Sequence, residues 1–136
     1  MHQNFTEEEF AHFLLPRAKI INSYVVEDPT THAITDMLSF YHLPSTVLKS
    51  DKHKMLYAAY SYYSVPGKHT IKDLIEDALV LAKAEDIDVF NALDLMENGS
   101  VMKELKFGPG DGHLQYYLYN WSCPATKPHE VGIVLH

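Results

Sequence analysis

The chain has 136 residues, of which 46% are hydrophobic, and carries a formal net charge of −7 at neutral pH. This length predicts a single domain, residues 1–136, with enough apolar side chains to form a core. Nucleic-acid-binding domains cluster Lys and Arg on one face, which this acidic chain with a single arginine, Arg17, is not expected to do. The acidity suits a basic peptide partner, or solubility alone.

The first elements expected along the chain are a helix and a β-hairpin. Thr6 and Glu9 have the spacing of a capping box, which predicts a short helix that ends before Pro16. Residues 20–27 and 34–42 are rich in β-branched and aromatic side chains and are separated by turn-forming residues. This pattern predicts two paired strands.

The middle of the chain is expected to alternate strand and helix. Residues 55–65 contain four tyrosines and favour a strand, although two alanines make the pattern ambiguous. The clearest helix is predicted over residues 70–85, where Thr70 and Asp73 form a second cap and the apolar residues follow a helical period. Residues 88–92 favour a short strand.

The last part of the chain is expected to hold a short helix over 100–106 and strands over 113–121 and 131–136. Together the elements predict an α/β (α+β) domain with a mixed, mostly antiparallel sheet flanked by helices.

A glycine-rich turn spans residues 108–112 and contains Asp111. Phosphate-binding loops of this composition lead into a helix N-terminus, whereas a strand is expected here, so phosphate binding is disfavoured. The simpler interpretation is a turn in which glycines take positive φ and Asp111 caps its own backbone. The alternative is that Asp111 accepts hydrogen bonds from a bound hydroxyl or cation.

Two further features leave a structural and a functional interpretation open. The aromatic side chains of Tyr116, Tyr117, Tyr119 and Trp121 fit packing on a sheet, or a groove that binds a peptide. Asn91 lies among apolar neighbours and must satisfy its amide if it is buried. Its partner is either backbone or an extended ligand.

The chain ends on apolar residues followed by His136. A buried terminal carboxylate loses hydration, which raises its pKa and favours pairing with, or deprotonating, an amine. The other interpretation is an edge strand without a further role.

The cysteine and histidine content argues against metal and thiol chemistry. The nine histidines do not show the helical spacing with a carboxylate of a zinc hydrolase, so no metal site is predicted. Cys123 is the only cysteine, which excludes internal disulfides, and inert packing is the favoured role. Without an apolar run of ~20 residues or a signal-peptide pattern, we expect a cytoplasmic chain with no transmembrane segment.

Five stretches of the sequence are recognisable together, namely residues 39–41, 43–46, 58–61, 90–98 and 106–121. They resemble the N-myristoyltransferase (glycylpeptide N-tetradecanoyltransferase) family, and specifically its C-terminal half. The resemblance implies an acetyltransferase-like (GNAT-like) domain and an absent N-terminal half that supplies most of the myristoyl-CoA site and the oxyanion hole. Myristoyl-CoA would then be a co-substrate, and no tightly bound cofactor is expected.

The resemblance also implies roles for individual residues. The terminal carboxylate of His136 would be the general base that deprotonates the N-terminal glycine of a substrate, which requires His136 to be the last residue. Asp111 and Gly112 would face a small hydroxyl residue of the peptide, with Leu114 nearby. The remaining residues expected in the peptide groove are Ser45, Tyr60, Asn91 and Leu93.

The expected function is therefore the peptide-binding half of a protein N-myristoyltransferase, inactive in isolation. The alternative is a non-catalytic GNAT-like module that binds Gly-starting peptides. A free-standing acetyltransferase is disfavoured because the sequence has no CoA pyrophosphate loop. Without its other half the domain would expose an apolar face, which predicts a homo-oligomer.

Overall fold

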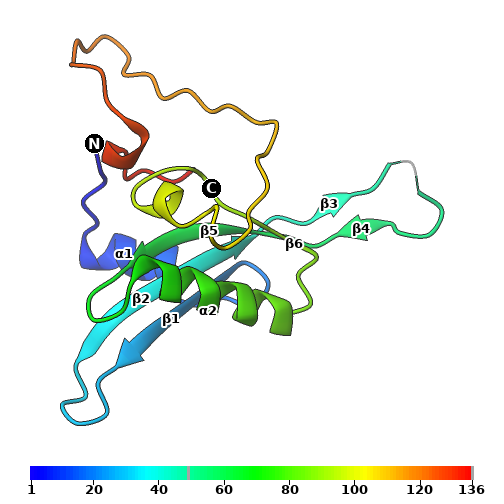
Figure 1. Ribbon diagram of the computed structural model, residues 1–136, viewed down its shortest axis with the longest axis horizontal. Helices are drawn as coiled ribbons and strands as arrows, with labels where there is room; N and C mark the ends of the chain where they lie inside the picture. Colours follow the sequence, from blue (N-terminus) through cyan, green and yellow to red (C-terminus); the bar gives the residue numbers. More distant parts are fainter. Residues whose placement is uncertain (49, 136) are drawn as a thin grey trace.

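A computed structural model describes residues 1–48 and 50–135 and centres on a four-stranded sheet (Figure 1). The strands lie in the order β1-β2-β5-β6. The first three are antiparallel, whereas β6 runs parallel to β5. This mixed, mostly antiparallel sheet confirms the predicted fold class. The strands are β1 (Ile21–Glu27), β2 (Ile34–His42), β5 (Ala58–Val65) and β6 (Val89–Asn91).

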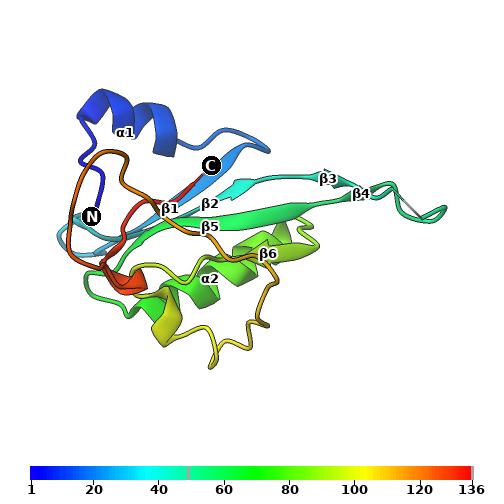
Figure 2. The same cartoon turned by 90° about the horizontal axis from the view of Figure 1, so that it is seen from above.

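Two helices cover opposite faces of the sheet, as Figure 2 shows. Helix α1 (Glu7–Leu14) begins at the capping box of Thr6 and Glu9, as predicted. Helix α2 (Ile71–Ala84) begins at an equivalent box formed by Thr70 and Asp73 and connects β5 to β6. A helical crossover is what a parallel strand pair requires, so the local helix signals also explain the sheet topology.

The face of the sheet under α2 carries the larger apolar core. Phe40 is 0% exposed and lies at its centre. Leu38 and Phe40 are two residues apart in β2 and therefore share one face, while Leu74 and Ala78 are four apart on α2 and meet them. The expected periods of strand and helix thus converge on one cluster.

The opposite face carries a second cluster that includes the end of the chain. Leu14 from α1 and Tyr62 from β5 pack there with Val134. The two chain ends are joined at this face, because Gly132 N donates to Met1 O over 2.7 Å and the Met1 ammonium donates to Glu130 O over 2.7 Å. Val131 and Val134, near the apolar end of the chain, are buried, whereas Leu135 is half exposed.

The tyrosine-rich stretch predicted as one strand is divided at Tyr57. Residues before it form β4 (Met55–Leu56), which pairs with β3 (Ser45–Thr46) in a hairpin that was not predicted. This hairpin projects beyond the sheet (Figures 1 and 2). The Leu43 N–H donates to Ala58 O over 2.8 Å and ties the hairpin to β5.

The predicted helix over 100–106 is wrong. A 3₁₀ turn, η1 (Asn98–Ser100), leads into irregular turns, and Lys106 takes a left-handed conformation with φ of 61°. Such a short segment cannot sustain a helix unless packing favours it, because nucleation costs more than a few hydrogen bonds return.

The predicted strands over 113–121 and 131–136 are also wrong. Residues 113–121 pair with no strand among the described residues, and Tyr117 and Tyr119 are exposed. Alternating aromatic residues satisfy the side-chain pattern of a strand, but a strand also needs a neighbour for its backbone. Residues 131–135, which follow the 3₁₀ turn η2 (Pro128–Glu130), form only one isolated bridge, between Gly132 and His2.

A buried carboxylate holds the loop that leads into α2. The side chain of Asp36 in β2 is fully buried. Its oxygens accept hydrogen bonds from Gly67 N (2.7 Å), His69 N (2.9 Å) and Thr35 Oγ1 (2.6 Å), and His69 Nδ1 lies 3.0 Å away. These bonds outweigh the effect of burial, which alone would raise the pKa of Asp36, and bring that pKa well below its usual range.

Candidate functional site

Three of the predicted groove residues lie together at the parallel edge of the sheet. Tyr60 and Asn91 are partners across β5 and β6, and partners in a ladder point to the same face. Leu93 follows two residues after Asn91 and packs in the cluster that contains Val134. The three side chains therefore belong to the face on which the end of the chain lies.

A stacked pair of tyrosines connects this group to the chain end. The rings of Tyr41 and Tyr60 are stacked, with centroids 5.4 Å apart and planes inclined by 15°. The Tyr41 hydroxyl donates to Leu135 O over 2.8 Å. Burial, with smaller effects from Tyr60 and Tyr116, raises the pKa of Tyr41, so its hydroxyl keeps its proton and remains a donor at neutral pH. His136, the predicted base, lies outside the described residues.

Ser45 lies apart from this group. It is exposed in the projecting β3–β4 hairpin, where its partner is Leu56. The hairpin nevertheless leads directly into β5, four residues before Tyr60. Ser45 is thus placed on an approach to the sheet edge.

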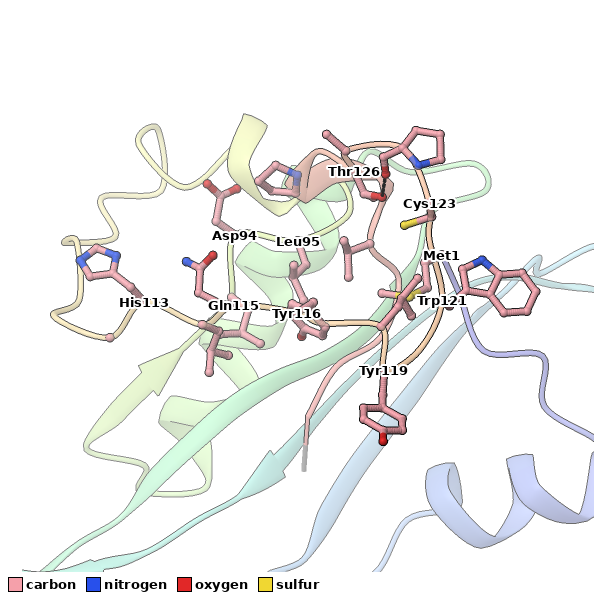
Figure 3. Close-up of a pocket in the computed structure, with 18 residues that line it drawn as sticks. Met1, Asp94, Leu95, His113, Gln115, Tyr116, Tyr119, Trp121, Cys123 and Thr126 are labelled. Atoms are coloured by element: carbon pink, nitrogen blue, oxygen red, sulfur yellow. Dashed lines mark hydrogen bonds between the residues drawn. The ribbon is translucent and has the colours of Figure 1, made fainter.

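The residues predicted in and after the glycine-rich turn, Gly112 and Leu114, lie at a cavity and not in the sheet-edge group. A cavity of about 1090 Å³ lies between the segment that follows β6 and the irregular segment 112–128, and Leu93, Gly112 and Leu114 contribute to it. This volume lies just above the range of about 300–1,000 Å³ that is typical of small-molecule sites. Figure 3 shows the segment bearing His113, Gln115 and Tyr116 running past Asp94 and Leu95. Leu93 is the residue common to the cavity and the sheet-edge group.

The glycine-rich turn differs from the predicted conformation. None of the described glycines has a positive φ, and the left-handed residue is Lys106, just before the turn. Asp111 is exposed and, among the described residues, accepts no recorded hydrogen bond. The prediction that it caps its own backbone is therefore wrong.

Several residues at the cavity were missed or misassigned from the sequence. Cys123 is exposed and lines the cavity, so the prediction that it packs in the interior is wrong, while its lack of reactivity stays a prediction. Trp121 also lines it and is exposed (Figure 3). The Tyr116 hydroxyl donates to Ile133 O over 2.7 Å. The alternating aromatic residues over 116–121 pointed to Tyr116 and Trp121, but the pattern did not indicate which of them would contact the end of the chain.

The described side chains and helices also bear on metal binding and on membrane insertion. Within the part of the chain that the structure describes, no three His, Cys, Asp or Glu side chains form a group suited to a metal ion. Neither described helix has the length and apolar character needed to cross a membrane.

Comparison with known proteins gives one consistent family. Residues 1–134 match the family model for the C-terminal domain of myristoyl-CoA:protein N-myristoyltransferase. A probable glycylpeptide N-tetradecanoyltransferase of Caenorhabditis elegans is 55% identical over 130 residues, which are 96% of this chain and 29% of that protein. Glycylpeptide N-tetradecanoyltransferase 1 of Arabidopsis thaliana is 53% identical over 97% of this chain and 31% of its own length. The chain thus spans about a third of the length of these curated relatives.

Solved structures agree with the sequence comparison. Saccharomyces cerevisiae N-myristoyltransferase with bound myristoyl-CoA superimposes with a TM-score of 0.74 at 40% identity, covering 82% of this chain and 30% of that one. Glucosamine-6-phosphate N-acetyltransferase from Arabidopsis thaliana, at 12% identity, covers 74% of this chain with a TM-score of 0.55. The second likeness concerns the fold alone and supports a GNAT-like domain.

Proposed function

The chain belongs to the myristoyl-CoA:protein N-myristoyltransferase family, of which it is the C-terminal domain, and we propose that it is the peptide-binding half of such an enzyme. The complete reaction transfers myristate from myristoyl-CoA to the N-terminal glycine amine of a protein. Since the chain spans 29% of its Caenorhabditis elegans relative, the remaining functions are assigned to an N-terminal half that binds most of the myristoyl-CoA.

The proposed chemistry needs a base for an ammonium group. A peptide α-amine has a pKa of ~7.7–8.0, so much of it is protonated at neutral pH. The terminal carboxylate of His136 would accept a proton from the glycine ammonium. The free amine then attacks the thioester carbon, an amide bond forms as the carbon–sulfur bond breaks, and CoA leaves as the thiol.

The observation that carries the proposal is the shared face of Tyr60, Asn91 and Leu93. These side chains lie on the face of the sheet against which Val134 packs. A peptide amine held beside them would be close to the end of the chain. A base placed within hydrogen-bond reach contributes roughly 10²–10⁴-fold to a reaction, so proximity is the property that matters.

The loop residues are assigned to the next part of the peptide. Gly112 and Leu114 line the cavity, and the exposed carboxylate of Asp111 is free of recorded partners among the described residues. In this proposal Asp111 and Gly112 meet a small hydroxyl residue of the substrate, while Ser45 lines the approach. The net charge of −7 favours peptides that carry lysine further along.

The exposed aromatic surface is assigned to a protein partner. Leu114, Tyr117, Tyr119 and Trp121 are exposed on one segment, and exposed apolar side chains that lie together in this way are typical of an interface when they form a patch. The N-terminal half is the proposed natural partner, and a homo-oligomer is expected when the chain is alone. A cytoplasmic location and the absence of a tightly bound cofactor remain predictions.

Peptide titration tests the binding function. A fluorescent peptide that starts with glycine, has a small hydroxyl residue near its start and carries lysine further on should bind the purified chain. Acetylation of its amine should weaken binding, because the carboxylate–ammonium contact is lost. Equal affinity for both peptides would refute amine recognition.

A turnover assay tests the division of labour. The purified chain, mixed with myristoyl-CoA and the same peptide, should form no myristoylated product, because the oxyanion donors and most of the thioester site are assigned to the other half. Detectable transfer by this chain alone would overturn that assignment.

Light scattering at increasing protein concentration tests the homo-oligomer. A chain that stays monomeric at every concentration would contradict this prediction.

A further inference from the structure

The last described residues are held by side-chain hydroxyls and not by a β-ladder. The backbone of each of three consecutive residues, 133 to 135, forms one hydrogen bond with the hydroxyl of a different tyrosine. Two of the hydroxyls donate to carbonyl oxygens and the third accepts from an amide. The bonds are Tyr116 Oη to Ile133 O (2.7 Å), Val134 N to Tyr63 Oη (3.3 Å) and Tyr41 Oη to Leu135 O (2.8 Å).

The three tyrosines come from separate parts of the fold. Tyr41 lies in β2, Tyr63 in β5 and Tyr116 in the irregular segment after the glycine-rich turn. Their convergence on three successive residues leaves the chain little freedom to slide. Val134 adds an apolar anchor, because it is buried in the cluster with Leu14.

A β-bulge explains how Tyr63 reaches this face. The register between β2 and β5 shifts between Leu38 and Phe40, so that Ser39 lies opposite two residues of β5. Ser39 Oγ replaces the missing ladder bonds, since it accepts from Tyr63 N over 3.0 Å and donates to Tyr63 O over 2.9 Å. A bulge redirects side chains, and here Tyr62 and Tyr63 both pack in the cluster at the chain end.

We propose that Tyr41, Tyr63 and Tyr116 are positioning residues that fix the backbone of residues 133–135 and thereby set where the terminal residue begins. The proposal rests on the assignment of the terminal carboxylate as the base. Misplacing a catalytic group by about 1 Å can cost on the order of 10²-fold in rate. A base at the end of a chain is tethered on one side only, so its support must come from the residues just before it.

The two donating hydroxyls keep their protons under ordinary conditions. Burial, followed by the proximity of other tyrosines, raises the pKa of both Tyr41 and Tyr116. Their bonds to the carbonyls of residues 133 and 135 are therefore present across the neutral range.

Amide hydrogen exchange in the whole chain tests the contacts. Tyr63→Phe removes the acceptor of the Val134 amide, whose exchange should accelerate about two- to tenfold, the effect of losing one net hydrogen bond. Tyr117→Phe is the matched control, because Tyr117 is 86% exposed and should leave that amide unchanged. The amide of Leu74 in α2 reports whether the fold is intact, and it should exchange equally in all variants. If the Val134 amide exchanges at the same rate in Tyr63→Phe as in the wild type, the proposal that Tyr63 holds this part of the backbone is refuted.

The order of the chain end tests the positioning role. The heteronuclear ¹⁵N NOE of Leu135 should fall in Tyr41→Phe and Tyr116→Phe and stay constant in Tyr117→Phe. The same two variants should bind the Gly-starting peptide with a smaller preference over its acetylated form, while affinity for the acetylated form stays constant. An unchanged preference would refute the positioning role. Equal affinity of the wild-type chain for both peptides would instead refute the proposed function, and with it the role of the three tyrosines in placing a base. The hydrogen-exchange result would still show whether the tyrosines hold the backbone of residues 133–135.

Discussion

Residues 1–91 and residues 92–135 are built on different principles. The first region contains all the named helices and strands except two 3₁₀ turns, and its backbone is satisfied by ladders and helical bonds. The second region is irregular and is held by tyrosine hydroxyls and by a few buried apolar side chains such as Val134. Phe40 is 0% exposed in the first, whereas Tyr119 is 98% exposed in the second. The comparison indicates that stability resides in the first region and that the second is shaped for contact with other molecules.

Truncation of an aromatic residue in each region should give the largest difference. Phe40→Ala removes a fully buried ring from between the sheet and α2, and should lower the free energy of unfolding by about 3–5 kcal/mol. Tyr119→Ala should change it by less than about 0.5 kcal/mol, because its ring is exposed. Urea denaturation followed by circular dichroism measures both. Similar losses would contradict the assignment of stability to the first region.

Two glycines provide a second, smaller contrast. A Cβ added at Gly67 would lie 2.0 Å from Thr35 O, whereas one added at Gly108 would meet nothing within 4 Å. Gly67→Ala therefore forces the loop away from β2 and should cost about 1–3 kcal/mol. Gly108→Ala should be within about 0.5 kcal/mol of the wild type. Thermal unfolding of the two variants compares them directly, and equal melting temperatures would show that the loop before α2 adapts freely.

The carboxylate of Asp36 should give the first region a dependence on acid. Its pKa is lowered in the folded state, so its contribution is present above the unfolded pKa of ~3.9 and is lost as the pH falls below that value. The difference in stability between wild type and Asp36→Asn should therefore shrink as the pH falls from about 5. Denaturation at a series of pH values measures it, and a constant difference would contradict the hydrogen-bonded carboxylate.

His69 should act in the opposite direction. Its hydrogen bond to Asp36 raises the pKa of His69, against the effect of burial. The stabilisation is present below the unfolded pKa of ~6.5 and is lost as the pH rises through the raised folded value. His69→Gln should therefore differ most from the wild type at mildly acidic pH and least above neutrality. Because His69 is half exposed, this effect should be weaker than that of Asp36.

The same division explains what the sequence could predict. In the first region local signals and tertiary contacts agree: Thr70 caps α2, and the apolar period of that helix meets the alternating residues of β2. The burial of Asp36 could also have been inferred, because it alternates with Leu38 and Phe40 on one face. Agreement between levels of this kind makes a segment predictable.

In the second region the local pattern was insufficient. Alternating aromatics over residues 113–121 fit a strand, but whether a backbone finds a partner depends on residues far away in the sequence. The hydroxyl contacts at residues 133–135 have separations of 17, 71 and 94 residues, which no local pattern encodes. Resemblance to the family supplied the groove residues, of which Tyr60, Asn91 and Leu93 lie together, while Ser45 lies on the hairpin and His136 outside the described residues.

One ion pair joins the two regions and should produce the smallest effect. Lys72 Nζ in α2 lies 2.6 Å from the Glu104 carboxylate in the irregular segment, and the two side chains are 38% and 63% exposed to water. Exposed pairs contribute little, because solvent and salt screen them and ordering two long side chains costs entropy. Lys72→Met should therefore lower the melting temperature slightly at low salt and not at 1 M NaCl, where the Debye length is about 3 Å. A large fall in melting temperature that persists at high salt would show that the contact between the two regions stabilises the fold more than an exposed ion pair can. The distinction between a stable first region and a second region shaped for contact with other molecules would then not hold at Lys72 and Glu104.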